Sequence, residues 1–170
     1  MSFLNISAAA RHLPQQPNMI RLICVGKVKD RHLSALIDDY CRKISRYHKI
    51  EIVEVKDEAI TSNEKEVLDK EGERVLSKIT EGEYVILLDL HGKSIDSVGF
   101  AEKIDRLFNS HSKICFVIGG SLGLSEKLIE RADERMKLSD LTFLHQMTRL
   151  IILEQIYRGF KILHHETYHK

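Results

Sequence analysis

The sequence has few of the residues on which small secreted or fibrous proteins depend. Only three cysteines, two prolines and nine glycines occur among 170 residues. The low proline and glycine content excludes a collagen-like chain. The cysteines are odd in number, lie far apart and form no Cys-x-x-Cys pair. We therefore expect no disulfide framework and no metal site, and a cytoplasmic location is favoured. Cys24 and Cys115 lie within apolar runs, which predicts that both are buried as small hydrophobic residues.

Long apolar runs and an excess of one charge are also missing. No stretch approaches the 18 apolar residues of a membrane span, so we expect no membrane association. The chain has 26 basic and 25 acidic residues, for a formal net charge of +1. Proteins that bind bare nucleic acid mainly through phosphates are usually more basic. We expect no DNA partner, and an RNA partner would have to meet a local patch.

Residues 1–18 differ in composition from the rest. They contain both prolines and no acidic residue, and they lack the apolar region of a secretory signal. We predict an extension that is disordered or tag-like, followed by a single domain over residues 19–170. That length is ordinary for one domain, and a content of 43% hydrophobic and 30% charged residues is typical of a globular protein.

Hydrophobic periodicity changes repeatedly from Met19 onward, which indicates alternating strands and helices. Strands are predicted over residues 20–25, 50–55, 84–90, 114–118 and 136–138. Helices are predicted over residues 33–44, from 62 or 63 to about 79, 101–108, a short one from 125, and 145–163. Gly92 is expected to end the third strand. Because parallel strands need helical crossovers, the pattern predicts an α/β fold with a parallel sheet.

Ligands of open α/β sheets bind beyond the carboxyl ends of the strands. Three segments lie there: residues 88–93, 119–123 and 138–143. Gly119, Gly120 and Gly123 allow the backbone to approach a ligand closely. Yet this loop is neither a dinucleotide nor a Walker sequence, and a lone glycine turn is more often structural than functional. The G-x-S-x-G spacing around Ser121 is weak evidence for a hydrolase, since the order of its partners does not fit.

The last predicted helix and the tail carry further polar groups. His145 and Arg149 are four residues apart and therefore share a face. Three histidines lie at 164, 165 and 169, but no His-Glu-x-x-His motif or nearby cysteine supports a metal site. The tail is either frayed or folded over a site.

Several motifs together resemble one known family. They are V-G-K at 25–27, D-K-E-G at 69–72, L-D-L-H-G-K at 88–93, F-V-I-G-G-S-L-G-L at 116–124, the segment 138–158, and a terminal Y-H-K. This set, in this order, is similar to the RlmH family of SPOUT-type methyltransferases, over residues 19–170. The resemblance implies a parallel-sheet SPOUT methyltransferase fold with a C-terminal trefoil knot, a rare exception among folds.

The resemblance also implies an activity. Such proteins act as homodimers and transfer a methyl group from S-adenosyl-L-methionine to N3 of a pseudouridine. The target lies in helix 69 of the 23S rRNA, and the substrate is the assembled 70S ribosome. By the same resemblance, the cofactor-binding positions are Leu88, Gly119, Gly120, Leu138, Ser139, Asp140, Leu141, Thr142 and Phe143.

The N3 proton of the pseudouridine must leave, so a base or an anion-stabilising group is needed. The catalytic candidates are His145, Arg149, Tyr168 and His169. Arg149 can alternatively hold a phosphate, and Tyr168 can stack on a splayed base. The family resemblance predicts that the tail reaches across the dimer, and the base itself stays open.

Two other functions stay open at this point. One is a SPOUT relative that acts on tRNA or another RNA, since the fold alone does not fix the target. The other is a ribosome-binding factor without catalytic activity, which failure to bind S-adenosylmethionine would favour.

Overall fold

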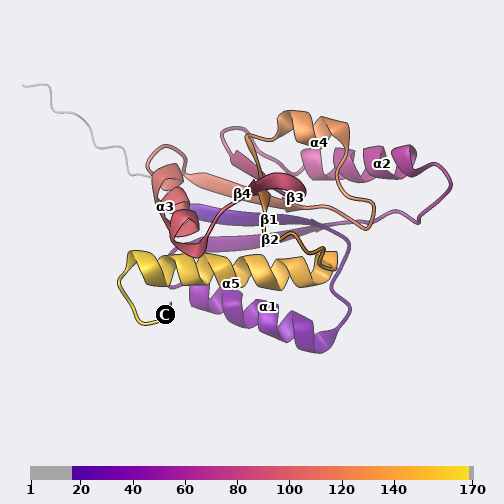
Figure 1. Ribbon diagram of the computed structural model, residues 1–170. Helices are drawn as coiled ribbons and strands as arrows, with labels where there is room; N and C mark the ends of the chain where they lie inside the picture. The colour runs from indigo at the N-terminus through magenta and orange to yellow at the C-terminus, as the bar shows by residue number, and fades with distance from the viewer. Residues whose placement is uncertain (1–16, 169–170) are drawn as a thin grey trace, which may run out of the picture.

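Five strands form one parallel sheet in the computed structural model, which describes residues 17–168 (Figure 1). The strand order is β2-β1-β4-β3-β5. The strands are β1 (Met19–Val25), β2 (Lys49–Val55), β3 (Tyr84–Ser94), β4 (Lys113–Ile118) and β5 (Glu134–Lys137). The helices are α1 (Arg31–Ile44), α2 (Glu64–Leu76), α3 (Ser97–Phe108), α4 (Glu126–Arg131) and α5 (His145–Leu163). The predicted α/β fold with a parallel sheet is confirmed, whereas residues 1–16 lie outside the described part of the chain.

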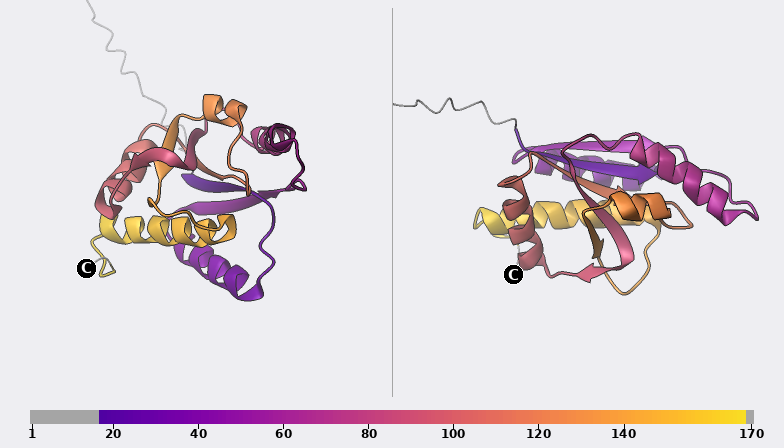
Figure 2. Two further views of the ribbon diagram at one scale, coloured as in Figure 1. Left: turned by 45° about the vertical axis from the view of Figure 1, so that its right-hand side comes forward. Right: turned by 90° about the horizontal axis from the view of Figure 1, so that it is seen from above.

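Helices cover both faces of the sheet. Helices α1, α3 and α5 pack on one face, and α2 and α4 pack on the other (Figures 1 and 2). The interior strand β1 therefore divides its side chains between two cores, with Leu22 in the first and Ile23 in the second. Cys24 and Cys115 are fully buried in the same way, as predicted, and burial raises the pKa of each thiol to about 12.

Local sequence signals account for where several helices begin. The Asp30 carboxylate accepts hydrogen bonds from the N–H groups of His32 and Leu33 at the start of α1. Asn63, one of the two predicted caps, accepts from the N–H of Glu66 at the start of α2. Helix α5 begins at His145 as predicted, but its N-cap residue is Leu144, which makes no side-chain capping bond. The start of α5 is therefore fixed by tertiary contacts instead of a cap.

The prediction that Gly92 ends the third strand is wrong. Strand β3 pairs with β5 through Leu88, departs from it, and returns to pair through Lys93, so that Met136 has partners in both parts of β3. A Cβ atom at Gly92 would lie 2.5 Å from the Met136 backbone nitrogen. Glycine is needed here because β3 passes directly against the β5 backbone. The trefoil knot implied by the resemblance stays a prediction.

Candidate functional site

A cleft of about 770 Å³ opens beyond Leu88 of β3, Ile118 of β4 and the end of β5. This is the position at which ligands of parallel α/β sheets bind, and its volume is that of a small-molecule site. Its walls are supplied by three loops and the first turn of α5. The lining residues fall in the ranges 88–91, 118–124 and 138–148, with Ile129 and Arg135.

Eight of the nine predicted cofactor-binding residues line this cleft. They are Leu88, Gly119, Gly120, Leu138, Ser139, Leu141, Thr142 and Phe143. Asp140 does not line it: its side chain is 90% exposed and forms an ion pair with Lys137, three residues earlier. This hydrogen bond lowers the pKa of the Asp140 carboxyl. The predicted contact of Asp140 with the cofactor stays a prediction.

The glycine loop forms one wall of the cleft with its backbone. Gly120 and Gly123 form an antiparallel bridge, in which the Gly123 N–H donates to the Gly120 carbonyl at 3.2 Å. Gly123 has φ +99°, a conformation that favours glycine. A Cβ atom at Gly119 would lie 2.3 Å from the Gly123 carbonyl oxygen. The loop can therefore close only if residue 119 has no side chain.

An ion pair that the sequence did not reveal lies at the same cleft. The Arg135 guanidinium of β5 donates through Nε to Asp89 Oδ2 at 2.6 Å, and both residues line the cleft. Asp89 follows the buried part of β3 and falls within the segment 88–93 that we singled out. The partnership itself depends on the β3–β5 register, which no local pattern shows.

His145, the first residue of α5, faces the cleft close to the end of β1. A Cβ atom at Gly26, which has φ +82°, would lie 3.4 Å from His145 Cε1. Burial lowers the pKa of His145, and the charge of Arg149 lowers it further, while Asp57 opposes both. His145 is therefore neutral near neutral pH, as a proton acceptor must be. Its Nδ1 is buried and has no partner among the described residues, and His145 as a residue lines the cleft.

Arg149 lies one turn behind His145, and 1% of the residue is exposed. Its guanidinium donates to Glu54 at 2.5 Å and to the carbonyl oxygens of Gly26 at 2.6 Å and Val25 at 3.3 Å. These bonds fasten the first turn of α5 to the carboxyl ends of β1 and β2. Arg149 thus holds in place the helix turn that carries His145. Its predicted direct part in catalysis stays a prediction.

Substituting Arg149 by methionine is expected to lower the free energy of unfolding by about 3 kcal/mol, because it leaves a carboxylate and two carbonyls without their donor. Urea unfolding measures this loss. Arg42→Met is the control, since the Arg42 side chain is 78% exposed and pairs with Asp39 at 3.3 Å. The control should change stability by less than about 0.5 kcal/mol. If both substitutions lower the free energy of unfolding equally, the buried Arg149–Glu54 ion pair contributes nothing to stability.

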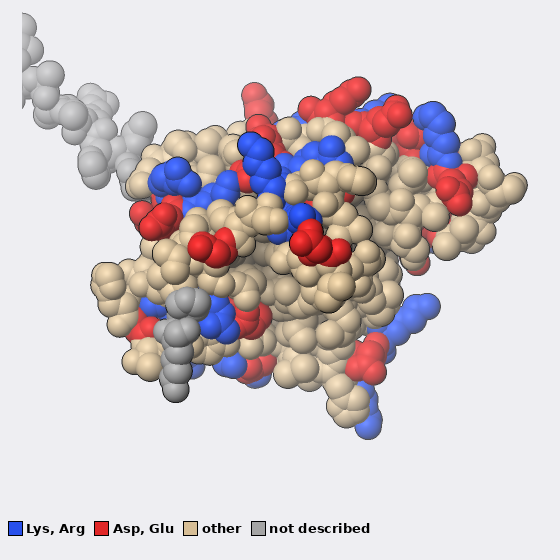
Figure 3. All heavy atoms as spheres, in the orientation of Figure 1, with Lys and Arg blue, Asp and Glu red and all other residues tan. Residues whose placement is uncertain are grey.

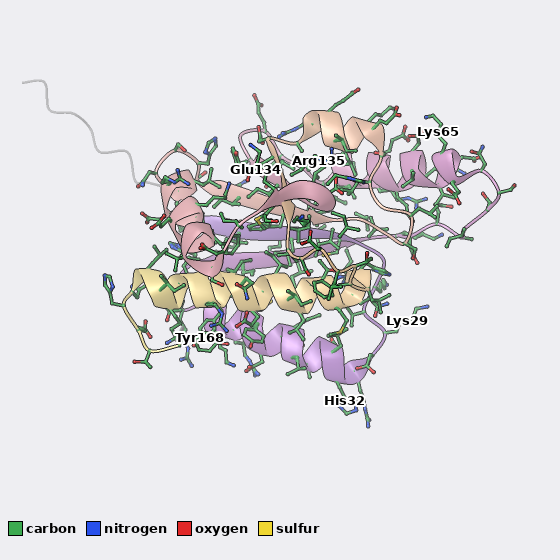
Figure 4. The ribbon with its side chains drawn as sticks, in the orientation of Figure 1. Lys29, His32, Lys65, Glu134, Arg135 and Tyr168 are labelled. Carbon is green, nitrogen blue, oxygen red and sulfur yellow. The ribbon has the colours of Figure 1, made fainter. Side chains whose placement is uncertain are left out.

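Tyr168 lies against the second half of α5, away from the cleft (Figure 4). Its hydroxyl donates to Glu154 at 3.2 Å, and its ring lies 5.0 Å from the Tyr157 ring and 4.8 Å from the Arg158 guanidinium carbon. Burial raises the pKa of the Tyr168 hydroxyl. Within one chain Tyr168 thus does not join His145, and His169 lies outside the described residues. The catalytic roles assigned to both stay predictions.

The charged side chains on the face seen in Figure 3 are of both signs and intermingled. This agrees with the near-neutral composition and shows no single basic field on that face. Within residues 17–168, no helix has the length and apolar character needed to cross a membrane.

Comparison with known proteins gives consistent matches. A family profile described as "Predicted SPOUT methyltransferase" matches residues 19–169. The protein named "Ribosomal RNA large subunit methyltransferase H" of Ruminiclostridium cellulolyticum is 45% identical over 157 residues, which are 89% of this chain and 99% of that protein. The protein of the same name from Alkaliphilus oremlandii is 46% identical over the same shares. Among solved structures, the A. aeolicus TrmH/SpoU tRNA modifying enzyme matches 88% of this chain and 79% of that chain, with a TM-score of 0.45 and 15% identity. That structural likeness is too distant to indicate an activity.

Proposed function

Because the chain belongs to the SPOUT methyltransferase family, we propose that it methylates large-subunit ribosomal RNA. The proposed reaction transfers a methyl group from S-adenosylmethionine to N3 of a pseudouridine in helix 69 of the 23S rRNA. Its relatives at 45–46% identity, matched over 99% of their length, are named as large-subunit rRNA methyltransferases. The observation that carries the proposal is the cleft, which gathers eight of the nine positions assigned to the cofactor.

The residues present fit S-adenosylmethionine. The cleft is large enough, and it offers backbone on the glycine-loop side and apolar side chains at Leu88, Ile118 and Leu138 on the other walls. Such walls suit a flat adenine ring and backbone contacts to its edge. S-adenosylmethionine, when bound, supplies an electrophilic methyl group on a sulfonium sulfur. We assign its binding to the glycine loop, Leu88 and the cleft-lining residues of 138–143.

The protein's part in the reaction is to position the acceptor and to remove a proton. In the overall change, the S–CH₃ bond of S-adenosylmethionine and the N3–H bond of the pseudouridine break and an N3–CH₃ bond forms. The products besides the methylated base are S-adenosylhomocysteine, whose sulfur keeps the bonding electron pair, and one proton. Among the catalytic candidates that the structure describes, His145 is the one that is neutral and lines the cleft. We therefore propose that His145 accepts the proton, at Nε2. Arg149 holds the helix turn that carries His145, which keeps the distance to the acceptor fixed.

We further propose that the protein is a cytoplasmic homodimer and that its substrate is the assembled 70S ribosome. Leu141 is 71%, Leu144 62% and Met147 42% exposed, an apolar group beside the cleft mouth that a second chain can cover. In this dimer, the tail of the second chain brings its Tyr168 and His169 to the substrate. A modest local patch suffices if the target is a composite ribosomal surface.

Methyl transfer from labelled S-adenosylmethionine tests the function. The substrates are 70S ribosomes that lack the modification, separated 50S subunits, naked 23S rRNA, and ribosomes whose target is left as uridine. We expect label on the 70S particles alone, at the single pseudouridine. No label with intact cofactor binding would identify a relative with another RNA target, and no label together with no cofactor binding would identify a ribosome-binding factor.

A further inference from the structure

The residues of the motif Asp69–Gly72 do not line the cleft, but the motif lies directly behind the cleft. Gly72 of α2 faces the N-cap of α4, where a Cβ atom would lie 2.1 Å from Ser125 Oγ. Helix α2 can therefore pack closely against the start of α4. This approach places the preceding residue, Glu71, beneath the glycine loop.

The Glu71 carboxylate is buried and only half satisfied. The residue is 5% exposed, and its Oε1 accepts a hydrogen bond from the Glu58 N–H at 2.9 Å. Its Oε2 is buried without a partner among the described residues. This oxygen lies 2.7 Å from the position that a Cβ atom would occupy at Gly120. A buried polar oxygen without a hydrogen bond is costly, so its retention here suggests a partner outside the chain.

A small chamber of about 20 Å³ is lined by both Glu71 and His145. Its other lining residues are 57–58, Ile60, Val67 and 120–122. The volume suits one water molecule, which needs at least two polar partners. Glu71 Oε2 and His145 Nδ1, which belong to the lining residues, are both buried and have no hydrogen-bond partner among the described residues. His145 lines the cleft as well as the chamber.

We propose that Glu71 is a positioning residue for proton transfer, acting on His145 through one water molecule in this chamber. The water accepts a hydrogen bond from His145 Nδ1–H and donates one to Glu71 Oε2. The imidazole is thereby held with its lone pair on Nε2, toward the cleft. The inference rests on the proposed function, in which the proton lost from the methyl acceptor passes to Nε2 and leaves an imidazolium that the carboxylate stabilises.

Other charged groups near His145 also raise or lower its pKa. Arg149, one turn along α5, disfavours the imidazolium, while Asp57, in the loop after β2, favours it. Glu58 faces the same chamber, and Glu54 is bound to Arg149. Burial raises the pKa of Glu71, the direction expected of a carboxyl that can share a proton.

Nitrogen-15 NMR of the imidazole rings tests the inference on the protein alone. Three forms are compared: wild type, Glu71→Gln, and Glu73→Gln as a control on the exposed side of α2, where Glu73 pairs with Lys127. His145→Gln identifies the resonance. We expect the neutral ring of wild type to carry its proton on Nδ1. Glu71→Gln should lose this preference and titrate at lower pH, while Glu73→Gln matches wild type. An unchanged His145 resonance in Glu71→Gln overturns the proposal.

Kinetics on the ribosomal substrate give the second readout. Glu71→Gln should retain cofactor affinity and melting temperature, since its amide oxygen still accepts the Glu58 N–H. Its single-turnover rate should fall by about tenfold to a hundredfold, with the acid limb of the pH profile moved to lower pH. Lost cofactor affinity with an unchanged rate at saturation would assign Glu71 a merely structural role and overturn the proposal. If wild type transfers no methyl group, the proposed function fails, and the NMR experiment still decides the coupling.

Discussion

Replacing Gly119 by alanine is expected to abolish binding of S-adenosylmethionine while the sheet stays folded. The new Cβ atom would lie 2.3 Å from the carbonyl oxygen and 2.9 Å from the carbonyl carbon of Gly123, and 3.1 Å from Leu124 Cδ2. Because two of these atoms are backbone, the loop must open to make room, and the cleft wall is lost. We expect a loss of affinity of about a hundredfold or more, equivalent to about 2.7 kcal/mol.

Isothermal titration calorimetry measures this loss directly. The matched control is Gly159→Ala in α5, where the nearest atom to the new Cβ, Ala101 Cα, lies at an ordinary 3.5 Å. The control should bind the cofactor as wild type does and be slightly more stable, because alanine favours the helix. Wild-type affinity in Gly119→Ala would contradict the assignment of this loop to the cofactor.

Gly92→Ala is expected to lower the free energy of unfolding more than Gly119→Ala or Gly159→Ala does. Its Cβ atom would lie 2.5 Å from the Met136 nitrogen and 2.6 Å from the carbonyl carbons of Arg135 and Met136. Strands β3 and β5 must separate there. We expect the free energy of unfolding to fall by about 3 kcal/mol, at the upper end for overpacking, and cofactor binding to be lost with it.

Urea denaturation followed by circular dichroism gives the stability difference, again with Gly159→Ala beside it. Cofactor affinity should be measured on the fraction that stays folded. Wild-type stability in Gly92→Ala would show that the β3 backbone does not pass against β5 at this position.

The order of elements could be predicted from the sequence because it depends on local periodicity. The observed α5 agrees with the helix predicted over residues 145–163, whose apolar stripe runs from Ile152 to Leu163. Gly92 shows the limit of this reasoning. A glycine after an apolar run usually marks the end of a strand, but here it permits a close approach to Met136, 44 positions later in the chain. Such a contact becomes visible only when the strands are paired.

Some features of the candidate site could likewise be predicted from the sequence and others could not. The glycine loop could be located from the sequence because its composition and its place after a buried strand are local features. The roles of Arg149 and Glu71 could not, since each depends on a partner from another element: Glu54 on β2 and the backbone of Glu58. His145 and Arg149 do share a face, as their spacing predicts. The burial of Arg149 and its hydrogen bonds to the ends of β1 and β2 could not be predicted from this spacing.

The double pairing of Met136 also bears on how the chain folds. Met136 of β5 pairs with Leu88 and with Lys93 of β3, so β5 has its full set of pairs only when both parts of β3 are in place. Contacts between such distant segments form slowly, because loop closure precedes the energy gained. Both prolines of the chain precede β1, which removes proline isomerisation within the sheet as the source of a delay. Arg135 of β5 and, after it, residues 138–139 and 141–145 line the cleft, so a chain in which β5 is not docked lacks that wall of the cleft.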